Sequence, residues 1–161
     1  MKFVIQKHRA STEHYDFRLR VGDALKSWAV PKGFSTDPRE KRLAIATEDH
    51  PVDYLDFEGV IPEDEYGAGT VMVWDIGDYR NLKDDSIEDA IADGHLTVWL
   101  EGKKIQGGYS LIRTDFGRDQ ESWMLVKMDD EKADARRHPV STEPDSATTG
   151  RDLEEIREQS Q

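Results

Sequence analysis

The sequence predicts a mainly β protein, a compact, closed or nearly closed β-barrel of about eight or nine strands with one short helix. Short segments rich in Val, Ile, Trp, Tyr and Thr follow one another from residue 2 to residue 128, separated by Gly, Pro and Asp. One segment shows a convincing helical spacing of apolar residues. Closure is favoured because an open sheet of many short strands would leave unpaired edges.

The elements follow in a simple order along the chain. The dipeptide Gly22-Asp23 fits a two-residue hairpin turn, so the second and third strands should pair antiparallel. The helix covers 86–93, where Asp85 or Ser86 caps its start and Gly94 ends it. The nine expected strands cover residues 2–7, 13–21, 24–30, 42–49, 54–58, 70–76, 96–101, 108–114 and 122–128.

Composition narrows the function classes. The chain has 161 residues and no Cys, which excludes disulfides, Fe–S clusters, thiolate zinc sites and a Cys nucleophile, so any metal must be bound by His and carboxylates. No apolar run is long enough to cross a bilayer and the first 20 residues are charged, so we expect no membrane contact and a cytoplasmic location. The net charge of −12 opposes nucleic-acid binding, but cations gather in the first 42 residues.

The character of the chain changes after Met128. Residues 129–161 hold ten Asp or Glu against five Lys or Arg and no aromatic residue. We therefore expect a domain over 1–128 and an acidic, disordered tail over 129–161. A short helix at 151–158 is an alternative, although two apolar residues, Leu153 and Ile156, are too few to anchor it.

The densest polar pattern lies in the second expected strand. Side chains alternate between the two faces of a strand, so His14, Asp16 and Arg18 share one face. Apolar side chains fill the other face: Tyr15, Phe17 and Leu19. His14 and Asp16 can both reach one divalent cation, and His8 is a candidate third ligand. The alternative is a strand whose polar face is simply solvated.

Two further segments add cations and a histidine. In a regular strand over 42–49, continued to the next residue, five side chains would share a face: Arg42, Ala44, Ala46, Glu48 and His50. The small alanines would leave room for a substrate group between Arg42 and His50. Lys32 lies in a Pro-Gly turn at the end of another strand. Arg18, Lys32 and Arg42 could together neutralise a phosphate, although each cation alone is more often a solvated surface charge.

Other features carry weaker signals. Tyr66-Gly67-Ala68-Gly69 has too few glycines for a nucleotide cradle and is interpreted as a hairpin-type loop. Tyr54 could donate to the site near His50 or could simply pack. No role is assigned to His95 or His138, and the four Trp residues are interpreted as core.

Several of these segments resemble the 3′-phosphoesterase domain of bacterial DNA ligase D, which also occurs as a stand-alone protein. The resemblance extends from residue 3 to about residue 128. It rests on these motifs: Gln6-Lys7-His8, His14-Tyr15-Asp16-Phe17-Arg18-Leu19, Lys26-Ser27-Trp28-Ala29-Val30-Pro31-Lys32-Gly33, Glu48-Asp49-His50-Pro51, Gly59-Val60-Ile61-Pro62 and Tyr66-Gly67-Ala68-Gly69.

The resemblance implies a manganese-dependent hydrolase of β-barrel fold, with other divalent cations open. Such enzymes remove a 3′-terminal ribonucleoside from a primer strand and then the remaining 3′ phosphate, leaving a 3′ hydroxyl. The implied metal ligands are His8, His14 and Asp16, with Arg18 and His50 on the phosphate. The remaining implied active-site residues are Gln6, Lys32, Arg42, Glu48 and Tyr54.

The implied partners are the 3′ ends of DNA or RNA-containing primer-templates during end repair such as non-homologous end joining. We expect a monomer, with DNA ligase or polymerase partners acting in trans. The attacking group, water or a ribose 2′ hydroxyl, stays open. Two alternatives remain: a non-catalytic module that binds 3′ ends, and an Fe(II) oxygenase using His14, Asp16 and His50.

Overall fold

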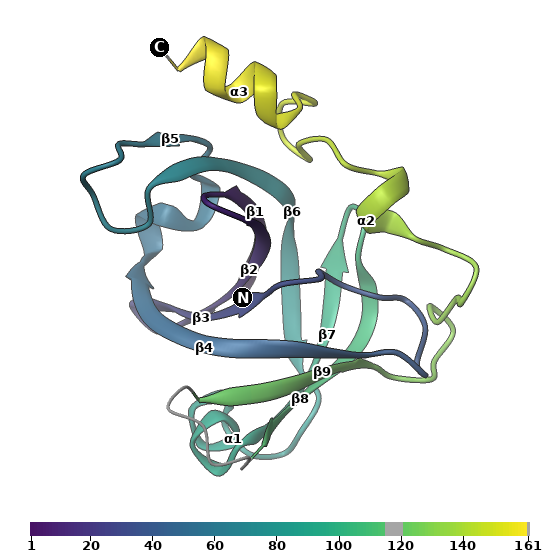
Figure 1. Ribbon diagram of the computed structural model, residues 1–161. Helices are drawn as coiled ribbons and strands as arrows, with labels where there is room; N and C mark the ends of the chain where they lie inside the picture. Colours follow the sequence, from purple (N-terminus) through teal and green to yellow (C-terminus); the bar gives the residue numbers. More distant parts are fainter. Residues whose placement is uncertain (115–120, 161) are drawn as a thin grey trace.

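The computed structural model describes residues 1–114 and 121–160, in which one antiparallel sheet closes into a barrel (Figure 1). The sheet order is β1-β2-β3-β4-β9-β8-β7-β6-β5, and a further β1–β6 pairing closes eight strands, leaving β5 as an extra edge strand. This confirms the predicted fold class. The strands are β1 (Lys2–Arg9), β2 (Glu13–Val21), β3 (Ala24–Val30), β4 (Lys41–Pro51), β5 (Gly59–Ile61), β6 (Gly69–Asn81), β7 (His95–Gly102), β8 (Gln106–Thr114) and β9 (Ser122–Lys127).

The barrel interior is aromatic. Trp28 and Trp123 pack edge to face with ring centroids 5.6 Å apart, and Tyr15 packs the same way on Trp74 at 5.4 Å. Trp99 is only half-buried and lies under Arg80 instead. On β1 and β2 the odd-numbered apolar residues belong to this core: Phe3, Ile5, Tyr15, Phe17 and Leu19. The even-numbered side chains of both strands are therefore directed to the opposite face of the sheet, where the functional site lies.

The predicted hairpin and helix are both present. β2 and β3 pair antiparallel around Gly22, whose φ of +61° suits a tight turn. Helix α1 (Ile87–Asp93) starts at Ser86, whose side chain accepts a hydrogen bond from the Asp89 backbone N–H, and ends at Gly94 with φ 82°.

The predicted strand over 54–58 is wrong. The chain instead forms a 3-10 helix, η1 (Val52–Asp56), and the short β5 follows it. The Phe57 N–H binds the Tyr54 carbonyl at 3.2 Å, and the two rings stack with centroids 5.0 Å apart. Gln6 donates to the Tyr54 and Phe57 carbonyls at 2.9 and 3.3 Å, so tertiary contacts with β1 hold this turn and override the local β propensity.

A β-bulge in β4 overturns the face predicted for Arg42, Ala44, Ala46, Glu48 and His50. Leu25 pairs with His50 whereas Ser27 pairs with Thr47, so β4 has one residue more than β3 between these pairs. An extra residue switches the side chains that follow to the other face. Ala44 and Ala46 therefore pack on the core, while Thr47 and His50 both line the pocket described below.

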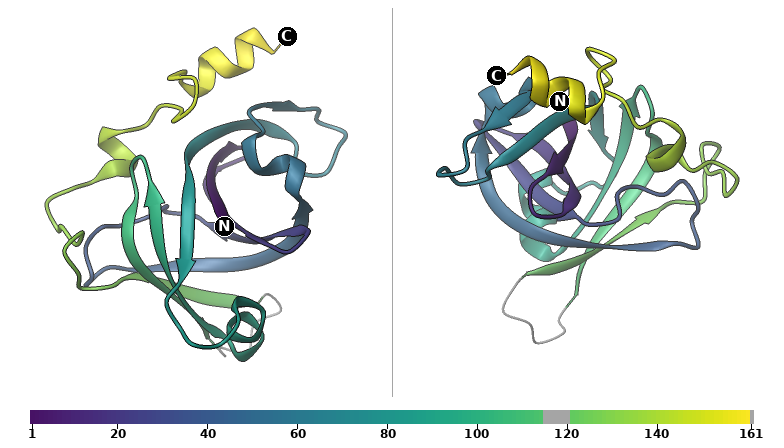
Figure 2. Two further views of the ribbon diagram at one scale, coloured as in Figure 1. Left: turned by 180° about the vertical axis from the view of Figure 1, so that it is seen from behind. Right: turned by 45° about the horizontal axis from the view of Figure 1, so that its top comes forward.

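The segment expected to be a disordered tail packs on the barrel in the described residues. It carries two short helices, α2 (Pro139–Thr142) and α3 (Leu153–Gln159), and α3 lies against β5 and β6 outside the barrel (Figures 1 and 2). Ile156 is 0% exposed, and the Ala147 N–H binds the Val73 carbonyl at 2.8 Å. The acidic composition is compatible with order here because the barrel supplies the apolar surface that the tail lacks. None of the described helices is long and apolar enough to cross a membrane.

Candidate active site

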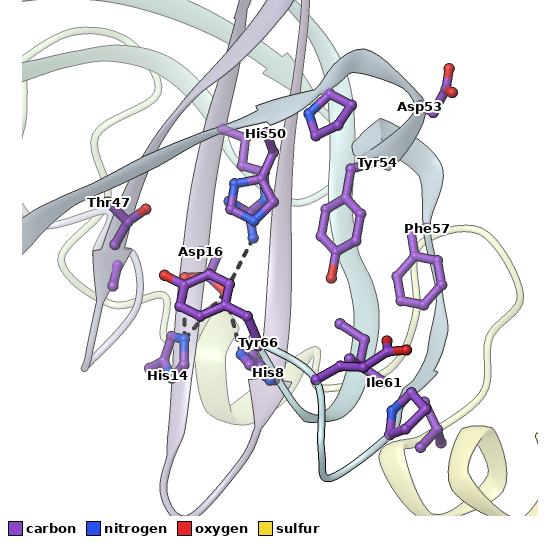
Figure 3. A pocket seen from close by; sticks show the side chains of 17 residues that line it. His8, His14, Asp16, Thr47, His50, Asp53, Tyr54, Phe57, Ile61 and Tyr66 are labelled. Carbon is purple, nitrogen blue, oxygen red and sulfur yellow. Dashed lines mark hydrogen bonds and ion pairs between the residues drawn. The ribbon is translucent and has the colours of Figure 1, made fainter.

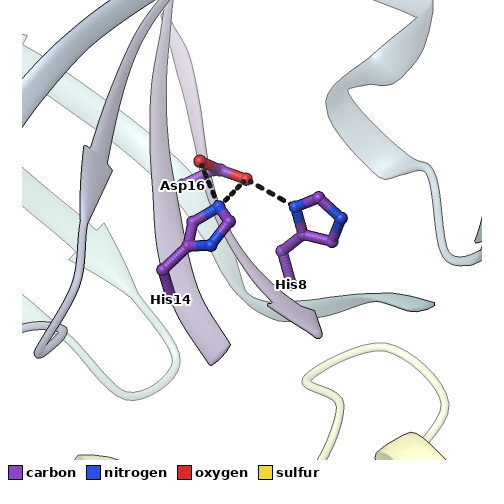
Figure 4. Close-up of side chains that lie close together, drawn as sticks. All are labelled: His8, His14 and Asp16. Atoms are coloured by element: carbon purple, nitrogen blue, oxygen red, sulfur yellow. Dashed lines mark hydrogen bonds and ion pairs between the residues drawn. The ribbon is translucent and has the colours of Figure 1, made fainter. Parts of the chain in front are cut away.

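The β1–β2 hairpin brings the three predicted metal ligands together. His8 pairs directly with His14, and Gln6 pairs with Asp16, so both imidazoles and the carboxylate emerge from one face. Their ligand atoms all lie within 4.8 Å of one another (Figure 4). His14 Nε2 is 3.1 Å from Asp16 Oδ1, and His8 Nδ1 is 3.6 Å from Asp16 Oδ2.

A backbone carbonyl orients the His8 ring. His8 Nε2 lies 3.0 Å from the carbonyl oxygen of Ala68, so this nitrogen donates and carries the ring proton when the imidazole is neutral. Nδ1, which faces Asp16, then keeps its lone pair. Two imidazoles and a carboxylate form a donor set that fits a divalent transition metal. The hydrogen bond from His8 to a backbone carbonyl outside the set fixes the orientation of that ligand.

Asp16 stays ionised inside the site. Burial favours the neutral carboxyl, but hydrogen bonds from His14 and His8 and the charge of Arg18 outweigh it and hold the pKa of Asp16 far below its usual range. The Asp16 carboxylate likewise raises the pKa of His8, because a protonated His8 ring can donate to it from Nδ1. The ionised Asp16 therefore supplies the negative charge of the donor set. Ala29 lies opposite Asp16 on β3, and its small side chain leaves the carboxylate open to the pocket.

Arg18 is the centre of a buried polar network. Its guanidinium is held by Gln6 Oε1 at 2.7 Å from Nε and by Ser27 Oγ at 2.9 Å from Nη1, and its residue is 4% exposed. Gln6 in turn donates to the Tyr54 carbonyl at 2.9 Å, and Arg18 lies 5.1 Å from the Tyr54 ring centroid. A planar donor fixed in this way is suited to contacting phosphate oxygens.

His50 approaches this network from β4. Its Nδ1 lies 3.1 Å from Arg18 Nη1 and 3.0 Å from the Glu48 carbonyl. Arginine only donates, so the first contact needs a lone pair on Nδ1, whereas the second needs a proton there. The Arg18 contact thus requires the neutral ring with its proton on Nε2, whereas the Glu48 contact fits the protonated ring or the neutral tautomer with its proton on Nδ1. Burial and the charge of Arg18 lower the pKa of His50, which favours the neutral ring with its proton on Nε2.

These groups open into one pocket of about 890 Å³ (Figure 3). Strands β1 to β3 supply one wall, with His8, His14, Asp16 and Arg18. The chain from the end of β4 to the start of β6 supplies the other wall. Its apolar lining consists of Pro51, Tyr54, Phe57, Val60, Ile61 and Pro62.

The structure does not bring every predicted residue to this pocket. Gln6 lies behind Arg18 and is fully buried. Glu48 contributes its carbonyl to His50, while its side chain is exposed. Lys32 is exposed in the turn after β3, and Arg42 forms an ion pair with Glu40 at 3.4 Å. Neither cation lines the pocket, so the roles of Lys32, Arg42 and the Glu48 side chain stay predictions.

The loop between β5 and β6 belongs to the site, although sequence reasoning treated it as an ordinary hairpin-type loop. Tyr66 and Gly67 line the pocket, and Ala68 orients His8. Gly69 has φ +132°, and a Cβ there would lie 2.2 Å from the Arg9 carbonyl oxygen. Only Gly allows this close approach. In the sequence, only the spacing of the two glycines indicated a loop with a close backbone approach.

Comparison with known proteins assigns the family. The model of the DNA ligase D 3′-phosphoesterase domain matches residues 6–113, which include all of the pocket's charged and imidazole groups described above. The chain belongs to this family.

The relatives of this 3′-phosphoesterase domain are much longer proteins. A multifunctional non-homologous end joining protein LigD from Pseudomonas aeruginosa is 47% identical over 155 residues, covering 95% of this chain and 18% of the relative. The Mycobacterium tuberculosis non-homologous end joining DNA repair protein LigD is 45% identical over 130 residues, covering 81% and 16%. That from Mycolicibacterium smegmatis is 43% identical over 155 residues, covering 92% and 19%. The chain thus spans less than a fifth of the length of these relatives.

Proposed function

We propose that this 3′-phosphoesterase domain heals nucleic acid strand ends. It removes a 3′-terminal ribonucleoside by phosphodiesterase action and then the 3′ phosphate, leaving a 3′ hydroxyl. The observation that carries the proposal is one pocket in which a His-His-Asp donor set lies beside the Arg18–His50 pair. Family membership supports the hydrolase class, and the names of the relatives support a role in non-homologous end joining.

His8, His14 and Asp16 would hold a divalent cation, and we propose Mn²⁺ for it. When bound there, the cation supplies Lewis-acid stabilisation to a phosphoryl oxygen. Arg18 donates to the phosphate and balances the charge that develops as the P–O bond breaks. Its partners Gln6 and Ser27 keep the guanidinium in place during this step.

His50 is placed to move a proton. When the ring is protonated, its Nε2 hydrogen can pass to the oxygen of the leaving group as the P–O bond breaks, which returns the ring to its neutral form. The Glu48 carbonyl, 3.0 Å from Nδ1, accepts the Nδ1 hydrogen when the ring is protonated and so supports the charged state. Either water or a ribose 2′ hydroxyl can serve as the nucleophile.

A recessed primer ending in a 3′ ribonucleotide or a 3′ phosphate tests the proposal. With Mn²⁺ the parent protein should shorten the first stepwise to a 3′ hydroxyl and dephosphorylate the second. His14→Ala and His50→Ala should lose nearly all turnover. His95→Ala is the matched control, because His95 is exposed on β7 and does not line the pocket. Undiminished turnover after thorough chelation would contradict the proposal.

The same experiment tests the non-catalytic alternative. A non-catalytic end-binding module would bind the 3′-phosphate primer in Mn²⁺ without turnover. An Fe(II) oxygenase built on His14, Asp16 and His50 is not favoured, since His50 contacts Arg18 and His8 takes its place in the donor cluster of the described residues.

A further inference from the structure

We propose that Tyr66 and the apolar wall beside it form a seat for the terminal nucleoside, the uncharged leaving group of the diester step. This inference rests on the proposed function and adds the part of the substrate that the second wall of the pocket recognises. It assigns Tyr66 as a stacking residue that determines specificity for a full nucleoside.

The Tyr66 side chain is largely exposed to solvent. The residue is 77% exposed although it lines the pocket, and its ring projects from the loop into the pocket (Figure 3). Within 1–114 and 121–160 its side chain has no hydrogen-bond or ring partner. Tyr66 lines the same pocket as Arg18. A large aromatic side chain left open beside a phosphate-binding group is suited to stacking on a base.

The loop that carries Tyr66 is attached to the metal-ligand wall. Two residues after Tyr66, the Ala68 carbonyl accepts from His8 at 3.0 Å. The Glu65 N–H closes a turn on the Pro62 carbonyl, also at 3.0 Å. The close packing of Gly69 on the Arg9 backbone secures the far end of the loop. The backbone that carries the ring is thus held at a set place relative to the phosphate site, as a substrate seat requires.

The chemistry of the two walls decides which part of the substrate lies on each. Residues 48–65 contain eight Asp or Glu and no Lys or Arg, and Phe57, Ile61 and Pro62 make their part of the lining apolar. On the opposite wall, Arg18 is the Lys or Arg side chain that lines the pocket. A strand that continued past the scissile phosphate would bring further phosphates to the acidic wall. A terminal nucleoside brings none, so this wall accepts an end and disfavours a continuing strand.

Steady-state kinetics on three primers with Mn²⁺ test the proposed nucleoside-binding seat. The first ends in a ribonucleoside, the second in an abasic ribose joined by the same diester, and the third in a 3′ phosphate. Tyr66→Ala should lower kcat/KM for the ribonucleoside end, relative to the 3′-phosphate end, by about tenfold to a hundredfold. Tyr66→Phe should keep the parent ratio because it keeps the ring. Leu82→Ala, an exposed apolar residue outside the pocket, is the control.

The abasic end makes the test sharper. If Tyr66 stacks on the base, the parent should already cleave the abasic end more slowly, and Tyr66→Ala should add little to that loss. An unchanged ratio in Tyr66→Ala would overturn the seat, as would an equal loss on all three primers or a loss in Tyr66→Phe matching that in Tyr66→Ala. A parent active on the 3′ phosphate, with a ratio insensitive to Tyr66, would leave the proposed function standing and refute this inference alone. A parent inactive on every primer would overturn both.

Discussion

Arg18 Nη1 lies 3.1 Å from His50 Nδ1, across 32 positions of sequence. The contact joins the two walls of the pocket, because Arg18 comes from β2 and His50 from the end of β4. It exists because the bulge in β4 turns His50 to the pocket face while Ala44 and Ala46 stay on the core. The pair therefore places a fixed positive charge and a titratable ring on the same phosphate site.

Replacing Arg18 tests whether its planar fork is required. Arg18→Ala should lower kcat/KM about 100-fold or more on both diester and monoester ends, as expected for loss of a preorganised donor. Arg18→Lys should not rescue it, because an ammonium cannot contact Gln6, Ser27 and His50 in the same geometry. Arg20→Ala, an exposed residue of the same strand, is the control in steady-state assays. Recovery of most activity in the Lys variant would refute the geometric role.

Gly69 tests the link between the loop and the metal ligands. A methyl group there would meet the Arg9 carbonyl oxygen at 2.2 Å and His8 Nε2 at 3.0 Å. Gly69→Ala should therefore displace His8 from Ala68 and weaken divalent-cation binding, measured by titration calorimetry, about 10–100-fold. Gly22→Ala is the matched control, because it also has positive φ but nothing within 4 Å of the added Cβ. Equal affinities in the two variants would contradict a link between the Gly69 contact and the metal ligands.

Asp75 is predicted to stabilise the barrel, although it lies outside the site. It is 0% exposed and accepts from the backbone N–H groups of Lys103 and Ile105, each at 2.8 Å. Asp75→Ala leaves these buried donors unpaired and should lower the free energy of unfolding in urea by at least about 3 kcal/mol. Asp78→Ala removes only an exposed ion pair with Lys2 and should cost far less. A loss of similar size in both would contradict this role.

Lys104 should make stability depend on pH above neutrality. Burial lowers the pKa of Lys104 to about 8 from its ordinary 10.5. Between these values the unfolded chain binds a proton that the folded chain has lost, so stability should rise with pH. Urea unfolding between about pH 7.5 and about pH 9.5 should show a rise of up to about 1.4 kcal/mol per pH unit.

The Lys104→Met variant should flatten this rise, whereas Lys103→Met, an exposed neighbour, should keep it. The buried tyrosines do not interfere in this range. Burial raises the pKa of Tyr15 and of Tyr79 to about 12, and their opposing contribution begins only when unfolded tyrosines titrate at about pH 10. An equal slope in parent and Lys104→Met would assign the pH dependence to other groups.

The parts of the site that follow from local periodicity could be predicted from sequence. The alternation of His14, Asp16 and Arg18 with apolar residues depends only on the two-residue period of β2, and the structure places all three in the pocket. The role of His8 could be predicted because His8 lies close to His14 along the chain. The β1–β2 hairpin pairs these two residues directly across the strands. The barrel itself followed from the number and spacing of short strands.

The remainder depends on contacts between distant segments. The bulge that redirects His50 arises from pairing with Leu25 on another strand, which no pattern within β4 reveals. Ala68 acts through its backbone carbonyl, so its side chain gives no signal. The order of the tail depends on the Val73 carbonyl and on the apolar cover over Ile156, both supplied by packing on the barrel. Composition alone treats such a segment as unfolded.

Mn²⁺ binding, followed by titration calorimetry and electron paramagnetic resonance, tests the central claim most directly. The parent protein and His50→Ala should each bind a single high-affinity ion, since His50 contacts Arg18 and lies outside the donor set. His14→Ala and Asp16→Ala should lose this binding while keeping the parent's circular dichroism spectrum. High-affinity binding that survives both ligand substitutions would contradict the claim that His8, His14 and Asp16 hold one divalent cation.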